Sequence, residues 1–327
     1  MKWKILNTDA KHYPDEAQAI LRGIGQATNK EITQDELKQE IPSYNILVVG
    51  LGLLIDKEVI NRGKDLKIIA SATTGLNHID VDYAESKGIK VVSLKGEQEF
   101  LSKVTSTAEL ALGLLVCLMR KIVWSFDGVR KDKWASENFR EHFEGHELRG
   151  RVMGIVGLGR LGRIMARYAE AFYMEVLAYD PYAEDSVFEE WGVKRVDLPK
   201  LLNSSDIVSI HIPLDRETEN LIGRKEFEQM KKSAYLVNTS RGEIINENDF
   251  LWALENKIIT GAAVDVLAGE LYFNKQTVKK NKLINYAKTH DDLLIVPHIG
   301  GMTVEAAVKT RVFIAEKLKN ETAGYKE

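Results

Sequence analysis

The segment GIVGLGRLG at 154–162 limits the possible folds of this chain more than any other stretch. Its glycines, Gly157, Gly159 and Gly162, follow the strand-like run RVMGIV and open the helix-like run RLGRIMARYAEAF. In a strand–turn–helix unit the first glycine permits a tight turn, the second admits a pyrophosphate, and the third lets the helix pack on the strand. Free N–H groups at the helix start also favour phosphate. The segment predicts a dinucleotide-binding βαβ unit; the alternative is a turn whose glycines serve only packing.

An acidic residue follows at the distance that such a unit requires. Asp180 ends the next strand-like run, EVLAYD, about 20 residues beyond the glycines. Its carboxylate would accept hydrogen bonds from the adenosine ribose and repel a 2′-phosphate, and no Arg or Lys follows in DPYAED. The sequence therefore favours NAD over NADP. A similar opening, NILVVGLGLL at 45–54, lacks the third glycine and is predicted to be a strand-to-loop turn.

Short apolar, β-branched runs alternate with helix-compatible stretches along the chain. The strand-like runs are KILN at 4–7, NILVVG at 45–50, KIIASAT at 67–73, KVVSL at 90–94, RVMGIVGLG at 151–159, EVLAYD at 175–180, DIVSIHIP at 206–213, AYLVNTS at 234–240, GAAVDV at 261–266 and LLIVPHIGG at 293–301. This alternation predicts an α/β fold with doubly wound parallel sheets. A length of 327 residues predicts about two domains.

Two long apolar-periodic segments interrupt this rhythm. STAELALGLLVCLMRKIVW at 106–124 predicts a helix buried on several sides, with Ser106 or Thr107 as N-cap and Glu109 in its first turn. The segment after residue 300, MTVEAAVKTRVFIAEKLKN, predicts an amphipathic last helix that packs back on the first domain.

Composition excludes several classes of protein. The formal net charge is −3, with acids and bases mixed, so no basic face for nucleic acid is expected. Cys117 is the only cysteine, which is typical of a reducing compartment. The N-terminus lacks the apolar core of a signal peptide, and no uninterrupted apolar run reaches the ~18–20 residues of a membrane span. A cytoplasmic protein without a membrane partner is expected. His142 and His146 lie in a predicted loop, and no metal site is expected.

Polar residues gather just beyond the strand-like runs of the second half, where ligands bind in open α/β sheets. These residues are His211 and Pro213, then Thr239, Ser240 and Arg241, then Asp265 and Glu270, and finally Pro297, His298, Gly300 and Gly301. A guanidinium can hold a carboxylate, and an imidazole can exchange a proton near neutrality. The alternatives are a surface ion pair of Arg241 with Glu243 or Glu247, a structural histidine, and a solvated loop acid at Glu270.

Together these residues carry a family pattern. Its motifs are TTGLNHID at 73–80, STAELALGLL at 106–115, GIVGLGRLG at 154–162, YDP at 179–181, HIPLDRETENLI at 211–222, VNTSRGEIINE at 237–247, AAVDV at 262–266 with Glu270 beyond it, and PHIGGMT at 297–303. Over nearly its whole length the chain resembles the D-isomer-specific 2-hydroxyacid dehydrogenases, in particular the phosphoglycerate dehydrogenase-like branch. The resemblance implies that Arg241, Glu270 and His298 are the catalytic set.

The resemblance also implies a plan of two Rossmann-like or flavodoxin-like domains with the active site in the cleft between them. Residues 1–104 plus 300–327 would form a discontinuous substrate domain, and 105–299 the NAD-binding domain. The helix from Ser106 would help to form a homodimer. The expected substrate-binding residues are Thr73, Gly75, Leu76 and Arg241. The expected NAD contacts are Thr74, Thr107, Gly157, Gly159, Arg160, Leu161, Gly162, Asp180, His211, Ile212, Pro213, Thr239, Ser240, Asp265, Gly300 and Gly301.

The implied activity is that of an NAD-dependent oxidoreductase acting on CH–OH groups, a D-2-hydroxyacid dehydrogenase or 2-oxoacid reductase. A non-catalytic NAD(H)-sensing interaction protein on the same fold is the alternative. The chain departs from the family in having Leu271, where much of the family has proline. It also has no Arg in GLGLLIDKEV, where phosphoglycerate dehydrogenases commonly have one, and this argues against a phosphorylated substrate. Lys95 or Lys103 could compensate. The basic segment 272–292 is expected to be a solvated insertion, with a lid edge or subunit contact as alternatives.

Overall fold

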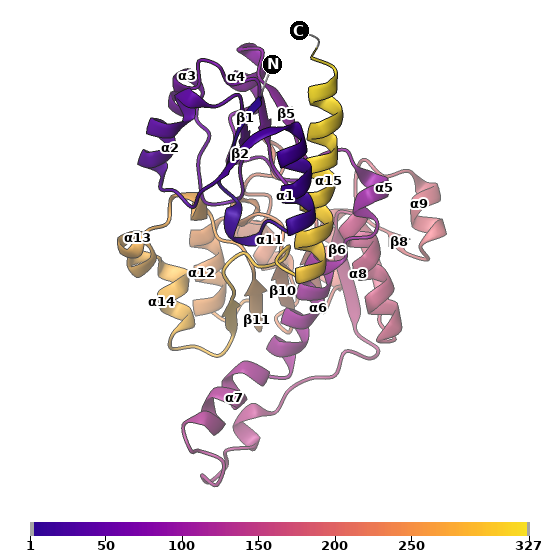
Figure 1. The fold of residues 1–327 in the computed structure, drawn as a ribbon. Helices are drawn as coiled ribbons and strands as arrows, with labels where there is room; N and C mark the ends of the chain where they lie inside the picture. Colours follow the sequence, from indigo (N-terminus) through magenta and orange to yellow (C-terminus); the bar gives the residue numbers. More distant parts are fainter. Residues whose placement is uncertain (1–2, 326–327) are drawn as a thin grey trace. The chain divides into compact units, whose positions relative to one another are not determined.

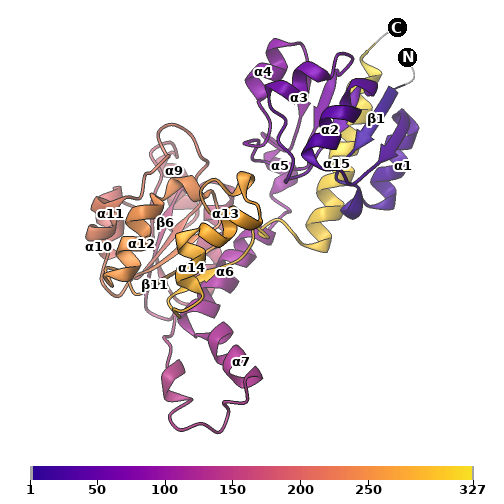
Figure 2. The same ribbon diagram turned by 90° about the vertical axis from the view of Figure 1, so that its left-hand side faces the viewer.

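The computed structural model describes residues 3–325, with no description of the His12 side chain. The chain divides into two compact units, Met1–Val104 with Met302–Glu327 and Thr105–Gly301. Figures 1 and 2 show the course of the chain.

The first unit contains a parallel sheet of five strands in the order β2-β1-β3-β4-β5. Its strands are β1 (Trp3–Asn7), β2 (Gly25–Asn29), β3 (Ile46–Val48), β4 (Ile68–Ala70) and β5 (Lys90–Val92). This order is that of flavodoxin-like sheets. The central strands β3 and β4 are buried throughout, as expected for a parallel sheet covered on both faces.

Helices cover both faces of this sheet. They are α1 (Asp15–Ile24), α2 (Gln34–Glu40), α3 (Lys57–Arg62), α4 (Val81–Ser86), α5 (Gln98–Leu101) and α15 (Val304–Ala323). One apolar cluster joins the sheet to α1 and α15, and the other joins it to α2, α3 and α4. The chain-terminal helix α15 lies beside α1, as the yellow and indigo ribbons of Figure 1 show. An ion pair between Arg311 and Asp9, at 2.6 Å, ties α15 to the loop after β1.

The second unit contains a parallel sheet of seven strands in the order β12-β11-β10-β9-β6-β7-β8. Its strands are β6 (Val152–Val156), β7 (Glu175–Tyr179), β8 (Lys194–Arg195), β9 (Ile207–Ile210), β10 (Tyr235–Asn238), β11 (Gly261–Val264) and β12 (Leu293–Ile295). The first strand, β6, pairs with both β7 and β9. The order of strands reverses at this point, which is where doubly wound sheets bind nucleotides.

Two apolar clusters lie on the two faces of the second sheet. The helices of this unit are α6 (Ser106–Met119), α7 (Ile122–Arg130), α8 (Arg160–Ala171), α9 (Asp185–Glu190), α10 (Leu198–Ser204), α11 (Arg224–Gln229), α12 (Glu247–Glu255), α13 (Lys275–Lys280) and α14 (Lys282–Ala287). One cluster joins α6, α8 and α9 to the sheet, and the other joins α10, α11, α12 and α14.

Two strands were absent from the sequence prediction. β2, with the sequence GQATN, pairs with β1 at an edge of its sheet, and β8 is two residues long at an edge of the other sheet. Neither carries a run of β-branched residues. A side chain at Gly25 would overlap the carbonyl oxygen of Trp3, so this strand depends on a close approach of two backbones.

The long apolar helix begins where the sequence predicts, but its cap differs. The residue before the helix is Thr105, not Ser106 or Thr107, and its hydroxyl donates to Glu109 instead of capping the backbone. α6 buries Ala108, Ala111 and several leucines. Gln98–Met119, which covers α5 and α6, has the length and apolarity of a membrane-crossing helix, as do core helices of many proteins.

The expectation of a solvated insertion at 272–292 is wrong for its second half. α13 is exposed, but α14 buries Leu283 and Tyr286 in the apolar core of the second unit. Tyr286 also donates a hydrogen bond of 3.0 Å to Asp292. Part of the segment therefore belongs to the fold of this unit.

Candidate active site

The glycine loop joins β6 to α8, and its three glycines have three different surroundings. Gly157 has a φ of +94°, in the region that favours glycine. A Cβ at Gly162 would overlap the carbonyl oxygen of Gly157, so helix and strand approach too closely for a side chain. A Cβ at Gly159 would have no neighbour within 4 Å among the described residues. Gly157 thus has the backbone conformation of a tight turn, Gly162 lies at the close packing of helix on strand, and Gly159 has open space beside it, each as the sequence predicts.

Asp180 follows β7 and holds the glycine loop. One carboxylate oxygen accepts the backbone N–H of Leu158 at 2.8 Å. The other accepts the N–H groups of Tyr182 and Ala183, at 2.9 and 3.1 Å. This carboxylate therefore orders both the loop that would receive the phosphates and the turn after β7.

The ends of β9 and β10 bring further predicted residues to the same edge of the sheet. His211 is buried, which lowers its pKa to about 4, and its Nε2 lies 2.8 Å from the Ser209 hydroxyl. The Ser240 hydroxyl donates to the carbonyl of Ile210 at 2.8 Å. Thr239 has a buried hydroxyl without a hydrogen-bond partner among the described residues.

His298 and Glu270 form an ion-pair contact, although 28 residues separate them in the chain. The Nδ1 atom of His298 meets Oε1 of Glu270, and both side chains are partly buried. His298 has a φ of +51°, an uncommon conformation for a residue with a side chain. Its backbone N–H donates to the carbonyl of Asp265 at 2.8 Å, which helps to hold this conformation.

Asp265 holds the turn that follows His298. Its carboxylate accepts the N–H of Ile299 at 2.6 Å and that of Gly300 at 2.8 Å. Burial raises the pKa of Asp265 to about 6, against the opposing effect of these hydrogen bonds. A Cβ at Gly300 would come within 2.8 Å of the same carboxylate and 3.1 Å of the Thr107 methyl group. Asp265, Gly300 and Thr107 thus meet at one place.

Arg241 follows β10 and is braced by its own turn. Asn238 donates its side-chain amide to the Arg241 carbonyl at 2.9 Å, and the Arg241 Nη1 donates to the Ser240 carbonyl at 2.6 Å. Burial lowers the pKa of the guanidinium, whereas the carboxylates of Glu270 and Glu243 act in the opposite direction. The charge of Arg241 therefore interacts with that of Glu270, which is also the partner of His298. Asn238 was missed from the sequence, where only its place in NTSRG marked it.

Glu243 and Glu247 were considered in the sequence only as surface partners of Arg241. Each of them accepts a backbone N–H group of the loop that carries Glu270: Glu247 from Ala268 at 2.9 Å and Glu243 from Gly269 at 3.0 Å. The sequence contains no signal for these contacts, because more than 20 residues separate each donor from its acceptor.

Other predicted residues lie at the start of α8 and in the loop after β4. Arg160 and Leu161 open α8, and burial lowers the pKa of Arg160. In the first unit, Thr73, Thr74, Gly75 and Leu76 form the loop after β4. The Thr73 hydroxyl donates to the carbonyl of Gly75 at 3.0 Å and lies 2.9 Å from the Ser71 hydroxyl.

The residues present fit a bound dinucleotide. α8 has 12 residues and begins at the glycine loop, so its N-terminus can receive phosphate. Gly159 lies in the loop after β6, with open space beside it, and Thr239, with its buried hydroxyl, directly follows β10. β6 and β9 pair at the point where the strand order reverses.

Comparison with known proteins agrees with this geometry. The profile of the family described as D-isomer specific 2-hydroxyacid dehydrogenase, NAD binding domain, matches residues 112–300. D-3-phosphoglycerate dehydrogenase of Archaeoglobus fulgidus is 37% identical over 293 residues, which cover 90% of this chain and 52% of that protein. The chain thus spans about half the length of this relative. Hydroxypyruvate reductase of Thermotoga maritima is 34% identical over 300 residues, 90% of each chain.

A solved structure extends the likeness to nearly the whole chain. D-lactate dehydrogenase from Aquifex aeolicus, in complex with NAD and lactic acid, matches with a TM-score of 0.81 and 25% identity, over 98% of this chain and 96% of that one. The chain therefore belongs to the D-isomer-specific 2-hydroxyacid dehydrogenase family, and residues 112–300 match the family's NAD-binding domain.

Proposed function

We propose that this chain is an NAD-dependent D-2-hydroxyacid dehydrogenase that also runs in reverse as a 2-oxoacid reductase. The observation that carries the proposal is the contact of His298 Nδ1 with the Glu270 carboxylate, in an environment shared with Arg241. A carboxylate on one ring nitrogen fixes the tautomer and stabilises the charged imidazole. His298 is thereby equipped as a proton donor.

The roles of the three residues follow from their chemistry. When bound, NADH supplies a hydride to the carbonyl carbon of the substrate. His298 gives the proton on Nε2 to the carbonyl oxygen, because its Nδ1 is engaged by Glu270. Arg241 binds the substrate carboxylate, for which a guanidinium offers two parallel hydrogen bonds. In the direction of oxidation, His298 accepts the proton of the hydroxyl group.

The predicted contacts for the cofactor and the substrate belong to this proposal. The glycine loop, with Arg160 and Leu161, would hold the pyrophosphate, and Asp180 the adenosine ribose. His211, Ile212, Pro213, Thr239, Ser240, Asp265, Thr74, Thr107, Gly300 and Gly301 would complete the NAD contacts. In the proposed substrate domain, residues 1–104 plus 300–327, the loop Thr73–Leu76 would bind the substrate carboxylate through its N–H groups.

We assign small, unphosphorylated 2-oxo acids as substrates. Residues 50–59 contain no arginine that could bind the phosphate group of a substrate. A hydroxypyruvate reductase is also similar to it over nearly the full length of both chains. We therefore expect hydroxypyruvate and glyoxylate to be better substrates than 3-phosphoglycerate and its 2-oxo acid. To bind either phosphorylated acid, Lys95 or Lys103 would have to neutralise the phosphate.

A panel of 2-oxo acids with NADH tests the activity. Pyruvate, hydroxypyruvate, glyoxylate and 3-phosphohydroxypyruvate are supplied in turn, and the nicotinamide absorbance is followed. Oxidation of NADH with hydroxypyruvate or glyoxylate is expected, with lower kcat/KM for the phosphorylated acid. Binding of NADH without turnover of any acid would contradict the enzymatic proposal and favour a nucleotide-sensing role.

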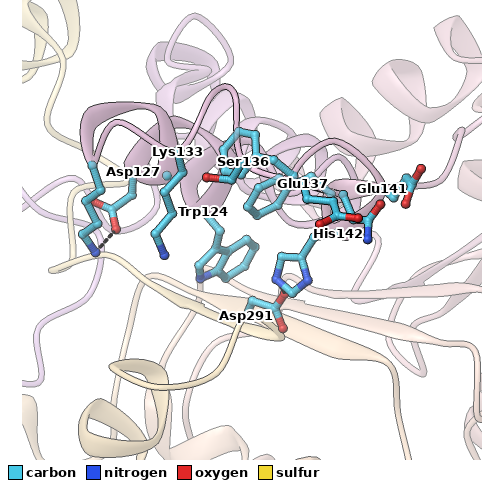
Figure 3. Close-up of a pocket in the computed structure, with 13 residues that line it drawn as sticks. Trp124, Asp127, Lys133, Ser136, Glu137, Glu141, His142 and Asp291 are labelled. Carbon is cyan, nitrogen blue, oxygen red and sulfur yellow. Dashed lines mark hydrogen bonds and ion pairs between the residues drawn. The ribbon is translucent and has the colours of Figure 1, made fainter.

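We further infer that the chain is a cytoplasmic homodimer. α6 packs most of its apolar residues internally, but the next helix, α7, exposes Ile122, Val123, Phe126 and Val129, with Phe126 62% exposed. A cavity of about 630 Å³ lies beside α7, and Trp124, Lys133 and His142 are among the residues that line it (Figure 3). None of the residues that line it belongs to the predicted active site. A second copy that covers α7 would bury this apolar face.

Sedimentation equilibrium tests the dimer. The wild type is expected to sediment as a dimer and a Phe126→Asp variant as a monomer, because a charge would be placed in the buried interface. Phe172→Asp, at a residue 41% exposed at the end of α8, is the matched control and should leave the dimer intact. A monomeric wild type, or a dimeric Phe126→Asp variant, would contradict the assignment of this face.

A further inference from the structure

Three successive backbone N–H groups before Glu270 each donate to a different carboxylate. Leu267 donates to Glu270 itself at 3.1 Å, Ala268 to Glu247 at 2.9 Å, and Gly269 to Glu243 at 3.0 Å. Gly269 has a φ of +68°, and the 3-10 turn Glu270–Tyr272 follows it directly. The loop that presents Glu270 is thus held at each residue by a separate acceptor.

The acceptors come from elements that follow Arg241. Glu243 lies in the 3-10 turn Gly242–Ile244, and Glu247 is the first residue of α12, which Asn246 caps through its side chain. Both carboxylates are therefore anchored by short regular elements rather than by a free loop. They connect the segment after β10 to the segment after β11.

The backbones of these two segments are in direct contact at Gly242. A Cβ at this residue would overlap the Leu267 carbonyl carbon and the Ala268 nitrogen, and would lie 2.6 Å from the Leu267 Cα. Only glycine permits this approach without a shift of backbone. Consequently the turn that carries Arg241 packs directly against the loop that carries Glu270.

The arrangement gathers like charges. Burial raises the pKa of Glu247 first, and the neighbouring Glu243 and Glu270 raise it further, against the hydrogen bond from Ala268. Arg241 opposes this repulsion, since Glu270 and Glu243 both interact with its charge. A neutral acceptor would hold the loop with less electrostatic cost.

We propose that Glu243 and Glu247 are positioning residues that set the Glu270 carboxylate against His298 by holding the backbone at 267–269. The proposal rests on the proposed function, in which Glu270 supports the proton donor. Neither residue touches the reacting atoms. Loss of either acceptor frees one N–H of the loop and lets Glu270 move away from Nδ1 of His298.

The kinetic test compares Glu243→Ala, Glu247→Ala and the double variant with Glu243→Gln and Glu247→Gln. Alanine removes the acceptor, whereas the glutamine carbonyl retains it without the charge. The alanine variants are expected to lose about 10–100-fold in kcat, since a displacement near 1 Å can cost this much. The KM for NADH should stay within about twofold of wild type, because the glycine loop is unchanged. Glutamine should restore most of the rate.

Glu255→Ala is the matched control, at an exposed glutamate of the same helix α12. It should leave kcat and KM unchanged. Thermal unfolding of every variant separates misplacement from loss of fold. Equal loss of rate in the glutamine and alanine variants, or a raised KM for NADH with unchanged kcat, would overturn the positioning role.

Amide hydrogen exchange tests the hold itself without any turnover. In Glu243→Ala and Glu247→Ala, exchange over 267–269 is expected to be faster than in wild type, and in Glu255→Ala it should be unchanged. Wild-type exchange rates in both alanine variants would overturn the inference, even if the enzyme is active. Failure of the wild type to reduce any 2-oxo acid would instead refute the proposed function, whatever the exchange data show.

Discussion

At the scale of the residue, the conformation of His298 matters as much as its chemistry. Its φ of +51° places it in the left-handed region, where residues other than glycine, asparagine and aspartate are disfavoured by about 1–2 kcal/mol. The backbone bond to Asp265 and the contact with Glu270 maintain this state. Such strained residues occur preferentially at functional sites.

A comparison of His298→Asn with His298→Ala separates the two properties. Both variants remove the proton donor, so both should lose about 10²–10⁴-fold in kcat with any accepted 2-oxo acid. Asparagine tolerates the left-handed conformation and should keep the wild-type Tm, whereas alanine should lower it. Steady-state rates and calorimetry provide the measurements. Retention of wild-type kcat by either variant would remove His298 from the mechanism.

At the scale of the element, the turn between β6 and α8 assigns different tasks to similar residues. Gly162 lies against the carbonyl of Gly157, and Gly159 faces open space at a φ of −70° that any residue can adopt. A side chain at Gly162 would therefore disturb the packing of α8 on β6, whereas a side chain at Gly159 would not.

Alanine substitution should separate these two glycines. Gly162→Ala is expected to lower the free energy of unfolding by about 1–3 kcal/mol through overpacking. Gly159→Ala should leave the unfolding of the free protein unchanged but weaken NADH binding by at least about tenfold, or 1.4 kcal/mol. Thermal melts and a titration of NADH fluorescence measure the two effects. Equal behaviour of the two variants would contradict the distinct roles of the glycines.

At the scale of the whole molecule, buried ionisable groups make stability depend on pH. The pKa of His211 falls from its ordinary value of 6.5 to about 4, so the unfolded chain binds more protons between these values. Stability then decreases as the pH falls from about 6.5 to about 4. Asp265, with its pKa raised from 3.8 to about 6, acts in the opposite direction over an overlapping range.

A variant isolates the contribution of His211. Urea unfolding of wild type and His211→Asn at several pH values between 4 and 7 cancels the effect of Asp265, which both proteins share. The variant lacks the group that must be charged on acidification. Its stability should therefore approach that of the wild type as the pH falls. Parallel curves over this range would show that His211 is not buried in its neutral form.

By itself the sequence determined what depends on local chemistry. The glycine turn, the β-branched strands and the polar residues beyond them follow from steric and hydrogen-bonding rules over a few residues. Hence the two α/β sheets were predicted, together with the residue types Arg241, Glu270 and His298. The edge strands β2 and β8 carry little local signal, and their pairing depends on neighbouring strands.

Only the tertiary structure decided which of those residues meet, because their contacts join distant segments. The approach of Gly242 to Leu267, the acceptors Glu243 and Glu247 for the Glu270 loop, and the burial of α14 all depend on such contacts. A carboxylate in NTSRGEIINE looks the same in sequence whether it faces water or an amide. Its role is set by where the backbone of another segment passes, which no local pattern encodes.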